Sequence, residues 1–514
     1  MATADGPDEQ VVDADRPGRD AQPDPLERHR LEFVPRAFPM ELPRTSRRDL
    51  LRRARQIGTV TGRHFAPLAA RSALTRRIAP DAYARPLRRT FEELGATFMK
   101  FGQLVGSSPG VFGDDVAAEF RSCLDTGPAV PFEEVRRIVE RDLGMPLDEA
   151  FWSFSETPIG TASISVVHKA TTVDGQRVAV KVLRPGIEHR VATDLDLFEP
   201  MLELVAKQTG EYAAGQLLAM FQGFRVQIGE ELDLRNEARA MLHYRRLLEE
   251  VDLPRVTVPE VRTDLSGPRV LTMEFFDGVA VDDLTSVARY GYDPAPVVHE
   301  VIKGFLLTAI RWGTFHGDVH AGNLLLLPDG RVGVIDWGIV GRLDPDTHEF
   351  FRQLIFAALG DEEAWPELAQ HAKRMYGPVL EQQLGMDDAQ LEAFLRATLG
   401  PLLTQPFGQV SLADLLSAPQ QKVAEARGIE AERLTVGAIY RRFREQRRVR
   451  AMAEAHGVYD SDFDRGMFLL SKQLMYFERY GKLFLADVGL FEDEGFFRAA
   501  LAAPTTAAPV IPPR

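Results

Sequence analysis

The stretch HGDVHAGNLLLLPDGRVGVIDWG, residues 316–338, decides the fold of this chain. Two short apolar runs, LLLL and VGVI, flank a Pro-Asp-Gly sequence, which is typical of the turn of a β-hairpin. A hairpin at this place would bring Asp318, Asn323 and Asp336 close together at its open end.

These three side chains form the set that phosphoryl transfer from ATP requires. One carboxylate orients or deprotonates the acceptor, while an amide oxygen and a second carboxylate hold Mg²⁺. Asp318 and Asn323 have the D-x-x-x-x-N spacing of a kinase catalytic loop, and Asp336-Trp337-Gly338 stands where such enzymes carry D-F-G. A solvated hairpin with acidic turn residues would explain one of these features but not their combination. We therefore predict an ATP and Mg²⁺ site, with Asp318 catalytic and Asn323 and Asp336 as metal ligands.

The composition sets wide limits on the rest of the chain. With 514 residues, 45% hydrophobic and 26% charged, it is long enough for several folded domains. The net charge of −14 argues against nucleic acid as a general partner. The single cysteine excludes a disulfide framework and cysteine-cluster metal sites. We find no apolar leader and no run of about 18 apolar residues, so we expect a cytoplasmic protein without a transmembrane helix or signal peptide.

The segment 44–90, from Arg44 to Thr90, is strongly basic in an otherwise acidic chain, with 13 arginines and two acidic residues. A roughly helical apolar stripe runs along its first part, formed by Leu50, Leu51, Ala54, Ile57 and Gly58. Such a helix could lie on an anionic membrane surface, which would make the protein a peripheral membrane protein. It could equally dock on the acidic surface of the protein itself.

From Pro158 onward the pattern predicts strands. A run of small residues comes first, namely Gly160, Thr161, Ala162 and Ser163. An apolar run, an Asp-Gly turn and the sequence V-A-V-K, ending at Lys181, follow. This order is that of the phosphate-covering loop and lysine strand of a kinase small lobe, so we predict that the loop and Lys181 bind the nucleotide phosphates. The lysine also needs a carboxylate, for which the helical region after it offers Glu230, Glu231, Asp233 and Glu237.

Two further strands are predicted at 256–261 and 269–276, after which the chain leads into helices. In a two-lobed kinase this is the hinge, and we expect Glu274 and Phe275 to contact the adenine. Upstream, Lys100 and Gln103 share one face of an apolar helix. A buried lysine is costly without a partner, so Lys100 should meet a carboxylate or a phosphate.

In order along the chain, these motifs resemble those of the UbiB/AarF (ADCK-like) atypical kinases. The matching sequences are KFGQ at 100–103, GTASISVVH at 160–168, VAVKVLRPG at 178–186, ELD at 231–233 and HGDVHAGN at 316–323. The phosphate loop departs from the family's run of alanines, and Trp337 replaces the usual phenylalanine. Neither change removes a catalytic group.

The resemblance implies an α+β, two-lobed protein-kinase-like fold with a helical N-terminal extension and a mainly helical C-lobe. The expected parts are a disordered tail at 1–40, the extension at 41–155, the N-lobe at 156–277, the C-lobe at 278–502 and a disordered tail at 503–514. It also implies that Glu237 pairs with Lys181. Lys100 and Gln103, near Glu231 and Asp233, would form a regulatory lid over the site.

For the activity, the resemblance implies ATP binding or hydrolysis connected with isoprenoid-quinone or other lipid metabolism, with protein phosphorylation disfavoured. Two alternatives stay open. The residues 316–338 are also similar to those of the aminoglycoside and choline kinases, which phosphorylate small molecules. A nucleotide-binding pseudokinase scaffold would use the same residues without transferring phosphate.

Overall fold

The computed structural model describes most of the chain. It covers residues 40–75, 82–106, 114–120, 127, 129–209, 212–251, 253–291, 293–383, 387–409 and 461–502. Residues 1–39 of the predicted N-terminal tail and the C-terminal tail at 503–514 lie outside these ranges. Within them, no helix is both long and apolar enough to cross a membrane.

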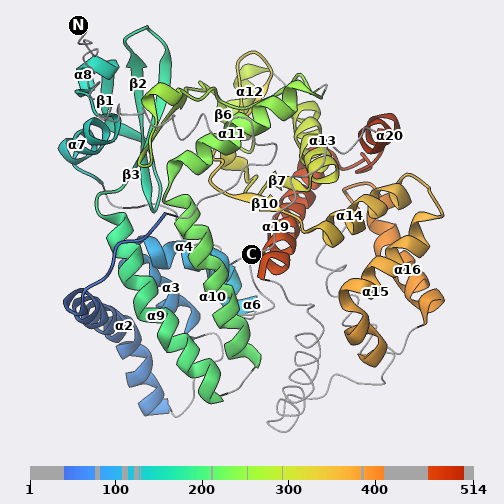
Figure 1. Ribbon diagram of the computed structural model, residues 1–514, viewed down its shortest axis with the longest axis horizontal. Coiled ribbons are helices and arrows are strands. Elements are labelled where there is room, and N and C mark those ends of the chain that lie inside the picture. Colours follow the sequence, from blue (N-terminus) through green and yellow to red (C-terminus); the bar gives the residue numbers. More distant parts are fainter. Residues whose placement is uncertain are drawn as a thin grey trace, which may run out of the picture.

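The N-lobe is an antiparallel sheet of four strands in the order β1-β2-β3-β5 (Figure 1). The strands are β1 (Phe151–Thr161), β2 (Ser165–Thr172), β3 (Arg177–Leu183) and β5 (Val270–Glu274). The predicted Asp-Gly turn joins β2 to β3, where Gly175 has φ of 90°, a conformation that glycine adopts without strain. The strand region begins at Phe151, earlier than the predicted Pro158 and the predicted lobe boundary at 156. Its first part carries an exposed Trp152 among polar residues, so no alternating pattern marks it.

The catalytic hairpin belongs to a second sheet, with the order β4-β9-β8-β6. Its strands are β4 (Val256–Thr257), β6 (Val279–Ala280), β8 (Leu324–Leu326) and β9 (Val332–Val334). Of the strand predicted at 256–261, the first two residues form β4, which pairs in parallel with β9, and Val261 forms an isolated bridge with Met273 of β5. A third, two-stranded sheet pairs β7 (Thr314–His316) with β10 (Val340–Arg342).

Helices of the N-terminal extension pack beside the long helices that follow β3 (Figure 1). The extension consists of α2 (Arg47–Thr75), α3 (Ala84–Leu94), α4 (Ala96–Gly106), α6 (Asp114–Phe120), α7 (Phe132–Leu143) and α8 (Leu147–Ala150). The helices after β3 are α9 (Ile187–Thr209), α10 (Tyr212–Glu231) and α11 (Leu234–Glu249).

Only part of the predicted apolar stripe of α2 is on its buried face, where Ile57 packs against the cluster of Val60, Leu94 and Phe98. Leu51 is 60% exposed, whereas Arg53 is 7% exposed and forms a bidentate ion pair with Asp194 of α9, at 2.6 and 3.0 Å. Its guanidinium also donates to the carbonyl of Leu94. On this face, α2 docks on the protein's own acidic surface, which is the second of the two predictions made for the basic segment.

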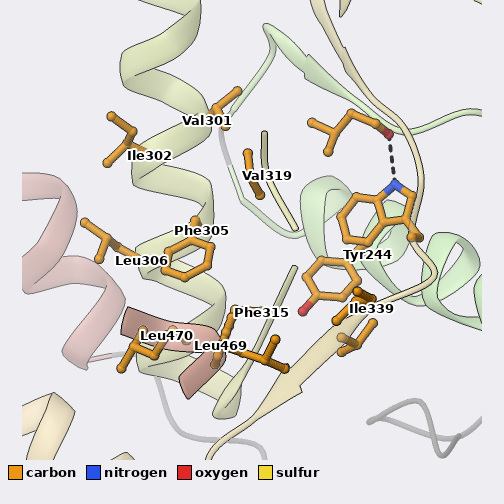
Figure 2. Packing of buried hydrophobic residues seen from close by; sticks show 14 of the residues in the cluster. Tyr244, Val301, Ile302, Phe305, Leu306, Phe315, Val319, Ile339, Leu469 and Leu470 are labelled. Carbon is orange, nitrogen blue, oxygen red and sulfur yellow. Dashed lines mark hydrogen bonds between the residues drawn. The ribbon is translucent and has the colours of Figure 1, made fainter. Parts of the chain in front are cut away.

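The C-lobe is built around α13, most of whose residues are buried. Figure 2 shows Phe305 and Leu306 of this helix packed toward Phe315 of β7 and Leu469 of α19. The lobe's helices are α12 (Leu284–Tyr290), α13 (Ala295–Trp312), α14 (Pro345–Ala358), α15 (Ala364–Gln383), α16 (Asp388–Thr404), α19 (Ser461–Phe484) and α20 (Glu494–Ala502). Two short 3₁₀ helices complete the structure, η1 (Thr263–Leu265) and η2 (Ala321–Asn323). The core thus joins the catalytic hairpin to the C-terminal helix α19.

Candidate active site

Lys181 is directed into the site by the alternation of side chains along β3. Val178, Val180 and Val182 point to one face and join the apolar cluster that contains α7. Lys181 therefore points to the opposite face, toward α11 and the catalytic hairpin. Its side chain is only 11% exposed, so a charged lysine at this place requires partners.

Two carboxylates meet this lysine. Its Nζ lies 2.8 and 3.0 Å from the two carboxylate oxygens of Glu237 and 3.0 Å from Oδ1 of Asp336. Glu237 stands in the first turn of α11, whose N-cap is Asp233; the Asp233 carboxylate accepts from the amide of Arg235. Of the carboxylates considered for Lys181, Glu237 is thus its partner, and Asp233 instead fixes the start of the helix.

Lys181 and Asp336 hold each other in their ionised forms, whereas burial outweighs Lys181 at Glu237 and raises the pKa of that carboxyl. Burial disfavours charged Lys181, but Asp336 and Glu237 outweigh it, so the lysine's pKa is raised. Burial likewise opposes ionised Asp336, yet Lys181 and then Lys100 lower the pKa of its carboxyl. Asp336 has φ of 58°, in the left-handed region that aspartate adopts only at a cost. Its carboxylate is therefore held in a strained backbone position beside two lysines.

The catalytic loop around Asp318 is shaped by its neighbours. The amide of Asp318 donates to Nδ1 of His316 at 3.0 Å, and Nδ2 of Asn323 donates to the Asp318 carbonyl at 3.0 Å. Burial lowers the pKa of His316 to about 4, so at neutral pH its ring is uncharged and Nδ1 can accept this bond. The amide of Ile335 donates to the Asn323 carbonyl, which brings the two ends of the hairpin together.

A lysine from outside the predicted motifs meets Asp318. Nζ of Lys472, on α19, lies 2.6 Å from Oδ1 of Asp318. Burial would raise the pKa of Asp318, but Lys472 outweighs it and lowers it. Lys472 lies outside every motif named above, since the sequence places its region only in the mainly helical C-lobe.

Lys100 of α4 finds its partner at the end of α10. Its Nζ lies 2.9 Å from Oε2 of Glu231, and both side chains are largely buried. Gln227 donates to the other oxygen of the same carboxylate. Lys100 also acts electrostatically on Asp318 and Asp336, which places the extension near both aspartates. Gln103 lies partly buried on the same helix, one turn further on.

Comparisons with known proteins agree with this arrangement. The family model of the ABC1 atypical kinase-like domain matches residues 122–367. An uncharacterized aarF domain-containing protein kinase of Arabidopsis thaliana, described as chloroplastic, is 32% identical over 417 residues; the alignment covers 79% of this chain and 73% of that protein. The chain belongs to the ABC1 (UbiB/AarF) atypical kinase family.

Two further proteins are similar to this chain in sequence. An uncharacterized protein of Mycobacterium tuberculosis H37Rv is 34% identical over 404 residues, which cover 78% of this chain and 74% of the relative. A protein named probable protein kinase UbiB, from Marinobacter nauticus, is 31% identical; the alignment covers 64% of this chain and 60% of that protein. A solved complex of a Mycobacterium tuberculosis protein with erythromycin is 27% identical, with a TM-score of 0.41, over 61% of this chain and 77% of that one.

The phosphate loop of this ABC1 protein connects β1 and β2. The amide of Ala162 donates to the carbonyl of Ser165, and Nε of Arg184 donates to the carbonyl of Ala162. Ser163 is 1% exposed. Gly160 and Thr161 lie at the end of β1, so the predicted loop is tied to the sheet on one side and to the end of β3 on the other. Its contact with phosphate stays a prediction.

The predicted hinge lies at the end of β5. The amide of Glu274 donates to the Glu260 carbonyl, and the amide of Phe275 donates to the Arg177 carbonyl. Neither amide is available to a base, so a contact with adenine would have to use other groups of these residues. Lys169 Nζ lies 4.3 Å from the centroid of the Phe275 ring, which fixes that side chain at the surface of the sheet.

The side chains present fit an Mg²⁺·ATP complex. Among the described residues, no group of three or more His, Cys, Asp or Glu side chains is placed to hold a metal ion alone. Mg²⁺ commonly takes only one or two protein ligands, and phosphates and water supply the rest. Because Nδ2 of Asn323 is engaged, Oδ1 is the atom left for a metal, and the Asp336 side chain is 48% exposed. A carboxylate and an amide oxygen are the donors that this ion prefers.

Proposed function

We propose that this protein binds Mg²⁺·ATP between its two lobes and is a phosphotransferase or ATPase of the UbiB type. The observation that carries the proposal is the position of Lys181, whose Nζ is held between Glu237 and Asp336 at 2.8–3.0 Å. A buried lysine fixed by one carboxylate and facing a second, more exposed one is arranged to receive phosphate oxygens. The family assignment supports the same activity.

The chain's own residues would divide the work as follows. Lys181 binds the α- and β-phosphates while Glu237 keeps its ammonium group in place. Asn323 and Asp336 hold Mg²⁺, which neutralises charge on the phosphate oxygens when it is bound. Asp318 orients the acceptor, or a water molecule, and accepts its proton. The proposal thus gives a separate task to each of the two aspartates.

The acceptor is proposed to be an isoprenoid-quinone or other lipid intermediate rather than a protein. The Lys100–Glu231 ion pair fixes α4 against α10, and Lys100 acts on both aspartates. A helix held so close to the catalytic aspartate leaves little room for a folded protein substrate. A slender chain with a terminal polar group, or water, needs less space.

Contact with a membrane is proposed to be peripheral and to use the outer face of α2. Arg53 is committed to Asp194 and largely buried. Arg52 and Arg63 pair with Asp49 at 3.4 Å and Glu93 at 2.6 Å, but their side chains stay 79% and 62% exposed. Leu51, 60% exposed, lies among them. Arginines beside an exposed leucine suit an anionic lipid surface, and each basic residue near such a surface contributes about 1 kcal/mol.

The experiment that tests the function follows radiolabelled γ-phosphate in the presence of Mg²⁺ and separate lipid and protein extracts. We expect slow, Mg²⁺-dependent turnover with label in free phosphate or in the lipid fraction, and faster turnover with anionic or isoprenoid-containing vesicles. The Asp318→Asn variant is the control and should lose turnover while it keeps ATP binding. Label mainly in protein would contradict the proposed acceptor, and label in a small water-soluble molecule would favour a small-molecule kinase.

A wild-type protein that binds Mg²⁺·ATP without releasing or transferring label would support the pseudokinase alternative. The membrane proposal has its own test, since vesicle pelleting does not require turnover. We expect Arg52→Glu/Arg63→Glu to reduce pelleting with anionic vesicles, and equal pelleting of variant and wild type would contradict the role of α2.

A further inference from the structure

Helix α19 lies against the catalytic machinery although it is outside the matched domain, residues 122–367 (Figure 1). Figure 2 shows its Leu469 and Leu470 beside Phe305 and Leu306 of α13. Gly466 lies so close to β10 that an added Cβ would come within 2.5 Å of the Arg342 carbonyl oxygen. The packing therefore fixes both the position and the rotation of α19.

From this position α19 binds the backbone of the catalytic loop on two sides of one residue. The amide of Val319 donates to Oε1 of Gln473 at 2.8 Å, and the hydroxyl of Tyr480 donates to the Val319 carbonyl at 3.2 Å. Gln473 is fully buried and Tyr480 is 2% exposed. Buried backbone groups that lack secondary-structure partners need such bonds. Two side chains of α19 thus satisfy the peptide groups next to Asp318.

Lys472 adds a charge to this clamp. Its Nζ lies 2.6 Å from Oδ1 of Asp318, and the two side chains are 16% and 22% exposed. The same ammonium lies 5.8 Å from the ring centroid of Tyr476. A carboxylate that is removed from water without a cation is costly, so Lys472 holds Asp318 in one ionised orientation.

We infer that α19 is a component of the phosphoryl-transfer site and that Lys472 is a positioning residue, which orients the Asp318 carboxylate toward the acceptor. The inference rests on the proposed function and extends it to a helix beyond the catalytic domain. A carboxylate that is already oriented pays no ordering cost when the acceptor arrives. Lys472 acts through Asp318, so its loss should slow turnover without weakening the binding of ATP, which Lys181 and Asp336 hold.

The test compares Lys472→Met and Lys472→Arg with a matched control, Lys482→Met, on the same helix. Lys482 is 42% exposed and pairs with Glu478 one turn away, so its loss should leave turnover unchanged. For Lys472→Met we expect kcat to fall about 100-fold, the size that positioned proton-handling groups contribute. The Kd of Mg²⁺·ATP should change less than about 3-fold, since ATP is held by groups elsewhere. Lys472→Arg keeps the charge and should recover much of the lost kcat.

Several results would overturn the inference. A kcat of Lys472→Met within about 3-fold of wild type would show that Asp318 needs no such partner. A faster Lys472→Met would show that the contact restrains Asp318 instead of orienting it. A joint loss of kcat and ATP binding, not rescued by arginine, would assign Lys472 a merely structural role. If the wild type neither binds nor turns over Mg²⁺·ATP, the proposed function fails, and the role of Lys472 in it fails as well.

A second measurement does not depend on turnover. Acetylation by an N-hydroxysuccinimide ester, followed by peptide mass spectrometry, reports how accessible each lysine is. We expect Lys472 to react more slowly than Lys482 in the wild type, and severalfold faster once Asp318→Asn removes its partner. Lys482 should react equally in both proteins. Unchanged labelling of Lys472 in Asp318→Asn would mean that the pair does not form, which separates failure of this inference from failure of the proposed function.

Discussion

Two aspartates of this site, Asp318 and Asp336, each meet a lysine, but the two pairs differ in construction. Asp336 meets Lys181, which Glu237 holds independently at 2.8 and 3.0 Å. Asp318 meets Lys472, for which Asp318 is the carboxylate partner among the described residues. The Asp336 side chain is 48% exposed, and that of Asp318 is 22% exposed.

The difference indicates how each pair is used. Because Glu237 anchors Lys181, Asp336 can turn toward a metal ion without leaving a buried lysine unpaired. Among the described residues, no second carboxylate holds Lys472, so loss of Asp318 would leave this lysine without a carboxylate partner. One pair is therefore suited to exchange ligands, and the other to hold a carboxylate still.

The largest effect should come from Lys181→Met. This change leaves Glu237, which is 3% exposed, as a buried charge without a cation. We expect a loss of about 3–5 kcal/mol in the free energy of unfolding, together with loss of ATP binding. Urea denaturation and nucleotide titration would measure the two losses.

A double variant, Lys181→Met/Glu237→Leu, is the control, because it removes both buried charges. It should recover stability but not ATP binding. If the single variant unfolds at the same urea concentration as the wild type, Glu237 does not depend on Lys181 in the folded protein, and the contrast between the two pairs is lost.

Asp336→Asn should have the next largest effect. The asparagine keeps the shape of the side chain but removes the charge that we assign to the metal. We expect the affinity for ATP to fall about 10–100-fold when Mg²⁺ is present, an energy of about 1.4–2.7 kcal/mol. Without Mg²⁺ the variant and the wild type should bind ATP alike. Equal Mg²⁺ dependence in a calorimetric titration would remove Asp336 from the metal site.

A decrease in pH should destabilise the folded protein through His316, whose ring accepts a hydrogen bond from the amide of Asp318. Burial lowers the pKa of this histidine to about 4, whereas in an unfolded chain it is about 6.5. Between these values the unfolded chain binds a proton that the folded protein does not. Stability is therefore fully present above pH 6.5 and falls as the pH decreases toward 4, by about 1 kcal/mol per unit.

The His316→Gln variant does not titrate in this range and should show a shallower loss of stability. Urea midpoints at pH 7.5, 6.5 and 5 would reveal the difference. His243, whose pKa burial lowers to about 3, contributes in the same direction in both proteins and so cancels. Parallel curves for variant and wild type would show that His316 is not the group responsible.

The smallest expected effect concerns Lys100, which lies near both aspartates. A double-mutant cycle with Lys100→Met and Glu231→Gln should give a coupling energy of about 1 kcal/mol, because Gln227 still donates to residue 231. Lys100→Met should also alter turnover more than it alters stability, if α4 covers the site. A coupling energy near zero would mean that Lys100 and Glu231 do not stabilise each other, and the N-terminal extension would then have no part in the contrast between the two aspartate–lysine pairs.

The sequence predicted well those parts of the site that follow from local rules. The Pro-Asp-Gly and Asp-Gly turns occur where their chemistry demands them, and the alternation along β3 places Lys181 on the inner face. The pairing of Lys181 with Glu237 was one of several open choices by spacing alone. The family resemblance selected it, and the structure contains the pair.

What sequence patterns could not supply were contacts between distant segments. Lys472 and Asp318 are 154 residues apart, and periodicity indicates only that α19 is amphipathic. The same holds for Arg53, whose burial depends on Asp194, 141 residues away. The strand predicted at 256–261 is shorter in the structure, because its length is set by pairing with β9, which lies far along the chain. In each case a tertiary contact decided what a local pattern left open.

The clamp from α19 has a consequence for the order in which the protein matures. Val319 leaves the ribosome 154 residues before Gln473 and 161 residues before Tyr480. Domains fold from the N-terminus as they are made, so the catalytic loop must wait for its last partners while the N-lobe and the catalytic hairpin can already form. A nascent or truncated chain would have Lys181 and Asp336 in place before Asp318 is fixed. The order of synthesis would then delay the activity of the protein until α19 has docked.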